Sequence, residues 1–161
     1  MSQEHKVIAC AILNLISASA SFLFVFLPLG VIIDGDGPVE VLFGDAMRYI
    51  ESEMWLLKYV YCLGFGILIQ LNVLMFFAVC RKDLLSPERK NDLFISSLVM
   101  LFGSSLITYI GIDAKKIVRG VVWPLLNRGP SVVSVRIGSG GLIALIPGIC
   151  SIVALLIAWR D

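Results

Sequence analysis

The chain has 161 residues, of which 58% are hydrophobic, and its formal net charge is +1. A soluble fold of this length could not bury so large an apolar fraction, so the composition favours an integral membrane protein. The near-zero net charge provides no overall field to attract a polyanion, and no nucleic-acid partner is expected.

Four apolar segments are each long enough to cross a membrane as a helix, which takes about 20 residues. Lipid cannot satisfy exposed backbone polar groups, so the spans must be helices. The first segment has about 27 apolar or small residues, too many for the ~7–15-residue core of a signal peptide, and is read as a retained span. We therefore predict an all-α integral membrane protein, a single four-helix domain over residues 1–161 with spans at 7–33, 55–80, 93–112 and 139–159.

The first span carries small and polar residues in a 3-4-3 spacing, which lets another helix backbone approach closely. This predicted packing face consists of Ala11, Asn14, Ala18 and Ser21.

The first connection, residues 34–54, is acidic and opens with the turn sequence Asp34-Gly35-Asp36-Gly37-Pro38. Residues Val39 to Phe43 follow as a short predicted strand. The two aspartates superficially resemble a calcium site, but the twelve-residue ligand progression of an EF-hand is missing. No metal ion is expected.

The second span has Gln70 near its middle and Asn72 two residues later. Neutral polar side chains at this depth suit hydrogen bonds between helices, so both are predicted to be helix-packing residues. Tyr59 and Tyr109 fall near span ends, where an interfacial aromatic belt lies. No span has an ionisable residue near its centre, which lowers the expectation of a proton-coupled carrier.

The second connection, residues 81–92, is short and basic and predicts a tight helical hairpin. In the third connection, residues 114–125 place apolar and basic residues on opposite helical faces, as in a helix that lies in the membrane interface. Residues 131–137 follow as a weak strand. Contact with lipid headgroups is assigned to Lys115, Lys116, Arg119 and Trp123.

The fourth span repeats a small residue every four positions, at Gly140, Ala144 and Gly148, and this pattern predicts a second helix-packing face. Pro147 within it is expected to kink the helix.

Orientation follows the distribution of Lys and Arg, and six such residues fall on each side of the four predicted spans. The early contrast between the acidic first connection and the basic second one favours cytoplasmic termini. Headgroup contact by the third connection would instead require that connection to be cytoplasmic.

Catalytic chemistry has few candidates. His5, the single histidine, lies near the chain start, and the four cysteines fall in or beside apolar segments without a CxxC pair. No phosphate-binding glycine loop is present. We expect no catalytic residue and no cofactor; an enzyme would have to use the loop acids Asp34, Asp36 and Asp113.

Four spans with strand-like pieces in the first and third connections resemble the layout of claudin-type tetraspans. The Trp-based motif and two cysteines of that family's first loop are absent from residues 34–54. The resemblance therefore assigns no site residue.

The expected function is that of a non-catalytic membrane subunit, which assembles with, stabilises or regulates a larger membrane protein complex. Its partners would be the lipid bilayer and another membrane protein or copies of itself. The alternative is a small transporter or oligomeric pore with a neutral polar lining, formed by Asn14, Gln70, Asn72 and Thr108.

Overall fold

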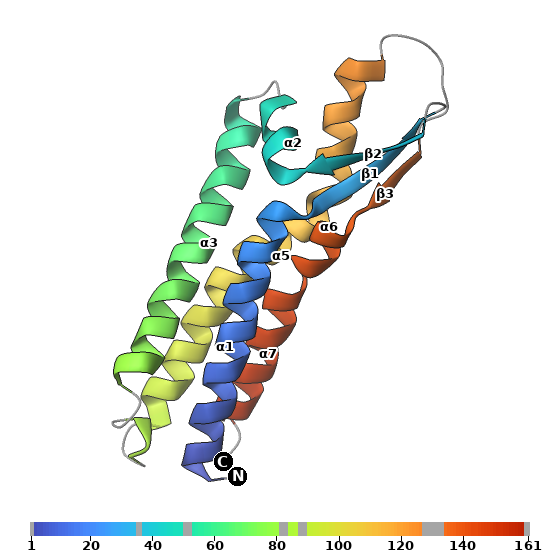
Figure 1. The fold of residues 1–161 in the computed structure, drawn as a ribbon. Helices are drawn as coiled ribbons and strands as arrows, with labels where there is room; N and C mark the ends of the chain where they lie inside the picture. Colours follow the sequence, from blue (N-terminus) through green and yellow to red (C-terminus); the bar gives the residue numbers. More distant parts are fainter. Residues whose placement is uncertain are drawn as a thin grey trace.

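A computed structural model describes residues 2–34, 37–49, 53–80, 84–86, 90–126 and 134–159. Within this part of the chain, four helices are long and apolar enough to span a membrane. They form an elongated bundle with both chain termini at one end and a three-stranded sheet at the other (Figure 1). The four helices of span length are thus confirmed, whereas the sheet shows that the chain is not all-α.

Helix α1 (Gln3–Phe26) is capped at its N-terminus by Ser2, whose side chain accepts a hydrogen bond from the backbone N–H of His5. It ends before Leu27, which has the extended conformation favoured ahead of a proline (φ −104°, ψ 152°). The chain then continues as strand β1 (Pro28–Asp34). The predicted span 7–33 was therefore wrong over 27–33, because an apolar β-branched run fits a strand as well as a helix.

The sheet has the strand order β2-β1-β3, and both pairings are antiparallel. Strand β2 (Gly37–Leu42) pairs with one side of β1, and β3 (Ser134–Ile137) with the other. The predicted strands in both connections are confirmed, although residues 131–133 lie outside the described part of the chain. Phe43, predicted to end a strand, instead begins the short helix α2 (Phe43–Tyr49), which the sequence analysis missed.

Helix α3 (Glu53–Val79) corresponds to the second predicted span. Helix α5 (Lys90–Leu126) has 37 residues and is thus about 55 Å long, well beyond the ~30 Å of a bilayer core. It includes both the predicted span 93–112 and the segment predicted to lie separately in the interface.

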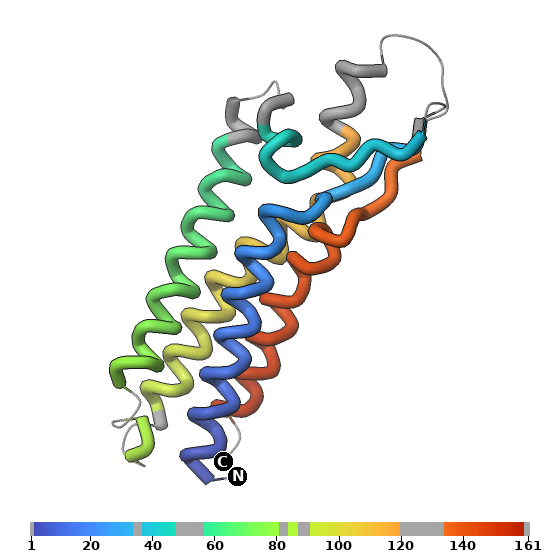
Figure 2. Tube along the Cα trace, viewed as in Figure 1, coloured from blue at the N-terminus to red at the C-terminus, as the bar shows by residue number. Residues whose placement is uncertain are grey.

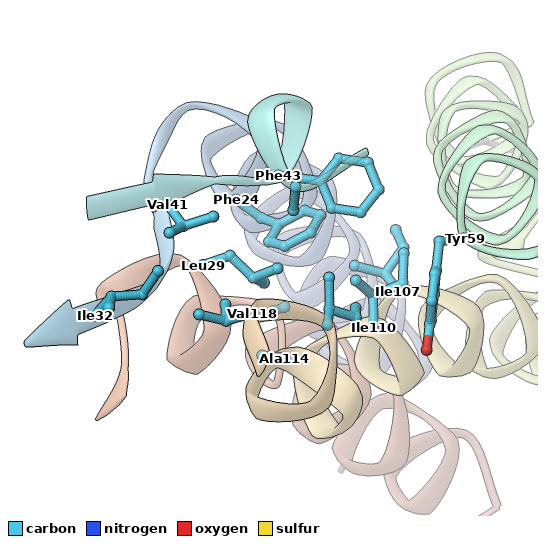
Figure 3. Close-up of a cluster of buried hydrophobic side chains, with 13 residues drawn as sticks. Phe24, Leu29, Ile32, Val41, Phe43, Tyr59, Ile107, Ile110, Ala114 and Val118 are labelled. Carbon is cyan, nitrogen blue, oxygen red and sulfur yellow. The ribbon is translucent and has the colours of Figure 1, made fainter. Parts of the chain in front are cut away.

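The extension of α5 supports the sheet. Its buried residues Ala114, Ile117 and Val118 share one core with Leu29 of β1 and Val41 of β2 (Figure 3). The prediction of a separate interfacial helix was wrong because an amphipathic face can pack on a sheet as well as on lipid.

The fourth predicted span consists of two helices, α6 (Ser139–Ile143) and α7 (Ile146–Trp159), with a turn at Ala144 and Leu145 between them. Pro147 lies in the first turn of α7, where its missing N–H breaks no helical hydrogen bond. In one continuous helix its ring would clash with the carbonyl of Ile143, so the helix is interrupted before it. The interruption lies beside Pro147, where a kink was predicted from the sequence. The trace of the chain shows α6 leading directly from β3 into α7 (Figure 2).

Candidate functional site

A group of hydrogen-bonded polar side chains connects three helices in the interior of the bundle. The Ser21 hydroxyl donates to Oε1 of Gln70 (3.0 Å), and Nε2 of Gln70 donates to the Ser104 hydroxyl (3.1 Å). The hydroxyl oxygens of Ser17 and Ser104 lie 3.2 Å apart. All four side chains are at most 1% exposed. We call Ser17, Ser21, Gln70 and Ser104 the polar clamp, since it joins α1, α3 and α5.

Two further polar side chains lie in the interior without joining the clamp. Both side-chain polar atoms of Asn14 and Oγ1 of Thr108 are buried and have no hydrogen-bond partner among the described residues. Thr108 faces α7: a Cβ added to Gly148 would lie 2.6 Å from its Oγ1. Asn14 and Gln70 are thus buried and Thr108 is half-buried, whereas Asn72 is exposed, so the four candidate pore-lining residues do not share one surface.

The small residues of the predicted faces lie at close contacts or beside a groove. A Cβ on Gly140 would lie 2.6 Å from the Leu27 carbonyl oxygen, and Ala144 lies against Gly111 of α5. On α1, Ala18 is buried, and Ala11 lines a groove of about 340 Å³ beside α3.

The sequence analysis missed a glycine pair between α3 and α5. A Cβ on Gly66 would lie 2.9 Å from the carbonyl oxygen of Gly103, and one on Gly103 would lie 3.3 Å from that of Gly66. The two backbones therefore meet where neither residue has a side chain.

Of the four helices of span length in the described part of the chain, α3 has the smallest buried share, and the segment Ser139–Trp159 follows with 33%. In its apolar window 22% of the residues are buried, against 44% for α1 and α5. Exposed side chains follow one line along this face, and we call them the outer stripe: Tyr61, Phe65, Leu68, Asn72, Met75 and Val79.

Asn72 is the polar member of this stripe. Its Nδ2 donates to the carbonyl oxygen of Leu68 in its own helix (2.8 Å). Among the described residues, its Oδ1 has no hydrogen-bond partner, and the side chain borders a groove of about 400 Å³ between α3 and α5. A carboxamide thus lies exposed among the apolar members of the outer stripe, at the edge of a groove that Asp92 and Ser96 also line.

At the sheet end of the bundle, ionisable and aromatic side chains connect α3 to α5. The Tyr59 hydroxyl donates to Oδ2 of Asp113 (2.9 Å), and the Lys58 ammonium donates to the Tyr109 hydroxyl. Lys58 also lies 4.6 Å from the centre of the Tyr109 ring, which stacks on that of Tyr59. The sequence analysis treated these tyrosines as belt residues because their partners lie about 50 positions away in the chain.

The predicted headgroup contacts lie on the extension of α5. Lys115, Lys116 and Arg119 are exposed there, while the side chain of Trp123 lies outside the described part of the structure.

Few of the described residues are candidates for catalysis or metal binding. Within the described residues, no three His, Cys, Asp or Glu side chains could together hold a metal ion. His5 is at the start of α1, where its ring contacts the Ser2 hydroxyl. Asp36 and the side chain of Asp34 lie outside the described residues.

No family model, curated protein or solved structure matches this chain.

Proposed function

We propose that the chain is a four-span integral membrane protein that acts as a non-catalytic subunit and assembles, through the outer face of α3, with another membrane protein or with copies of itself. The observation that carries this proposal is the outward-facing carboxamide of Asn72. The same face would stabilise or regulate the complex in which the chain resides.

The depth of Asn72 makes its exposure informative. It lies four residues from Leu68, the midpoint of the span Leu57–Val79, which is about 6 Å along the helix axis. The hydrocarbon core extends about 15 Å from its centre, so Asn72 would lie well inside it. An amide transferred from water to an apolar medium loses about 1–3 kcal/mol when its hydrogen bonds are not replaced. A protein partner with a polar group at that depth would offset this loss.

The interior of the bundle supports a structural role rather than transport. The clamp side chains bond to one another across α1, α3 and α5, so their hydrogen-bonding capacity stabilises the helix arrangement. A path for a solute through one bundle would have to break these bonds.

Purification of the tagged protein from its native membrane in a mild detergent tests the proposal. Wild type is expected to retain a stoichiometric membrane protein, either a different chain or an untagged copy of this one, and Asn72→Leu is expected to retain less of it. Ser105→Ala is the matched control. Ser105 is, like Asn72, an exposed polar residue that donates to a carbonyl oxygen of its own helix (Phe102, 2.7 Å), but it lies on α5, outside the outer stripe. A pure single chain that moves a solute after reconstitution into liposomes would overturn the proposal.

A further inference from the structure

We infer that the partner of the outer stripe is α3 of a second copy of this chain, packed parallel so that the two Asn72 side chains face each other. This inference rests on the proposed function and names the first protein contact through which the subunit assembles.

The outer stripe has the spacing of a helix-pairing seam. Successive members are separated by 4, 3, 4, 3 and 4 residues, from Tyr61 to Val79. Tyr61, Leu68 and Met75 recur every seven residues, and so do Phe65, Asn72 and Val79. Such a seven-residue repeat keeps one face toward a partner helix along a left-handed supercoil. The stripe is about 27 Å long, comparable with the ~30 Å hydrocarbon core. A partner helix could therefore follow it across the membrane.

The members of the outer stripe pack little against the rest of their own chain. Its five apolar members are 54–78% exposed: Tyr61, Phe65, Leu68, Met75 and Val79. The residues that follow them on one flank, Cys62, Ile69 and Phe76, are half-buried and turn toward the rest of the bundle. On the other flank lies Gly64, where an added Cβ would meet no described atom within 4 Å. A second backbone can approach closely on that side.

The chemistry of Asn72 favours a second copy as the occupant. Copies of one chain insert in the same orientation, so residue 72 of each copy lies at the same depth. A carboxamide has both a carbonyl acceptor and N–H donors, so two of them can bond reciprocally across a two-fold axis. In heptad terms, Asn72 occupies an a position, where one asparagine selects the register and the number of helices.

Cysteine crosslinking in native membranes tests the pairing. In a background with the four native cysteines replaced by alanine, Leu68→Cys and Met75→Cys each report contact along the stripe. Ile149→Cys is the depth-matched control, because Ile149 is 62% exposed at the midpoint of the span Ser139–Trp159. Oxidation with copper phenanthroline is expected to give covalent dimers from the two stripe variants and none from the control.

Adding Asn72→Leu to the stripe variants is expected to lower the association constant about three- to twentyfold, the range measured for interhelical hydrogen bonds in membranes. Asn72→Gln should restore most of the dimer, since it keeps the carboxamide.

Two results would overturn the inference. If the stripe variants yield no dimer while an Asn72-dependent partner of different sequence still co-purifies, the second copy is wrong and the proposed function stands. If the stripe variants yield no dimer and no partner co-purifies, both fail. Equal membrane insertion of the Leu68, Met75 and Ile149 variants, measured in the same membranes, shows that folding is not the difference.

Discussion

At Gln70 the carboxamide accepts a hydrogen bond from α1 and donates one to α5, whereas at Asn72 the same group faces away from the bundle. Their spacing of two residues, about 200° around the helix, separates an inner from an outer role. One side chain stabilises the fold, and the other is available for association.

Gln70→Leu is expected to lower the free energy of unfolding by about 1–3 kcal/mol, because it removes two interhelical hydrogen bonds from the polar clamp. Reversible denaturation in mixed detergent micelles measures this change. Asn72→Leu is the control and should leave the stability of a single chain unchanged. Equal losses in both variants would show that the interhelical hydrogen bonds of Gln70 do not stabilise the fold.

Tyr59→Phe is expected to destabilise the chain by about 1 kcal/mol, since the hydroxyl that donates to Asp113 is removed. Thermal unfolding in detergent measures the effect. Tyr61→Phe is the matched control two residues away, because Tyr61 is 58% exposed. A Tyr61 variant as unstable as the Tyr59 variant would contradict this assignment.

At the scale of elements, α5 is the central support. It meets α3 at the glycine pair, α6 beside Gly111, and α7 where Thr108 faces Gly148. It meets the sheet through Val118, which would lie 2.6 Å from a Cβ on Gly30. Each contact joins a small residue to a neighbouring element, so a larger side chain at these positions is expected to destabilise the bundle.

Gly66→Ala is expected to destabilise the bundle by about 1–3 kcal/mol, because the new Cβ would lie 2.7 Å from a side-chain carbon of Ile107 and 2.9 Å from the Gly103 carbonyl oxygen. Gly64→Ala, in the same helix but facing open space, should be neutral or stabilising by up to about 1 kcal/mol. Unfolding of both variants in detergent provides the comparison. Equal stability would show that α3 and α5 can separate at this point without loss.

Gly138→Ala is expected to disrupt the contact between the sheet and α6, since the added Cβ would lie 2.2 Å from the Pro28 carbonyl oxygen. Amide hydrogen exchange of β1 should accelerate, because α6 supports the start of that strand. Gly44→Ala, with no described atom within 4 Å of its added Cβ, is the control. Unchanged exchange in the Gly138 variant would mean that the sheet does not depend on this contact.

Hydrophobic runs and loop charges identified four helices, and β-branched residues identified strands in both long connections. Two boundaries were wrong because an apolar run does not show whether lipid or another part of the protein packs against it. The apolar run 27–33 looks like part of a membrane helix unless Pro28 is recognised as a helix end. The apolar face of the segment after Asp113 packs against the sheet. The tyrosine contacts with Lys58 and Asp113 depend on pairing between α3 and α5, which a single sequence does not specify.

At the scale of the whole molecule, the fold separates two ends. Both termini lie at one end and the sheet at the other (Figure 1). If the helices span a membrane, these ends lie on opposite sides, and we propose that the termini are cytoplasmic.

Single-cysteine labelling tests this topology. In cysteine-free protein, Glu40→Cys and Ser2→Cys lie on exposed residues at the sheet end and the terminal end. In sealed vesicles with the cytoplasmic side inside, an impermeant maleimide should label residue 40 directly and residue 2 only after permeabilisation. The reverse pattern would invert the orientation, and labelling of both residues from one side would contradict four spans.

The oxygen accessibility of a spin label at residue 68 in native membranes, measured by electron paramagnetic resonance, tests most directly whether protein covers the outer face of α3. The reference is a label at residue 149, since both positions lie at span midpoints and are more than half exposed in the single chain. The lipid-soluble oxygen should collide less often with the label at 68, because a partner helix lies over it. Equal collision rates at the two positions would show that this face meets lipid, and would contradict assembly through α3.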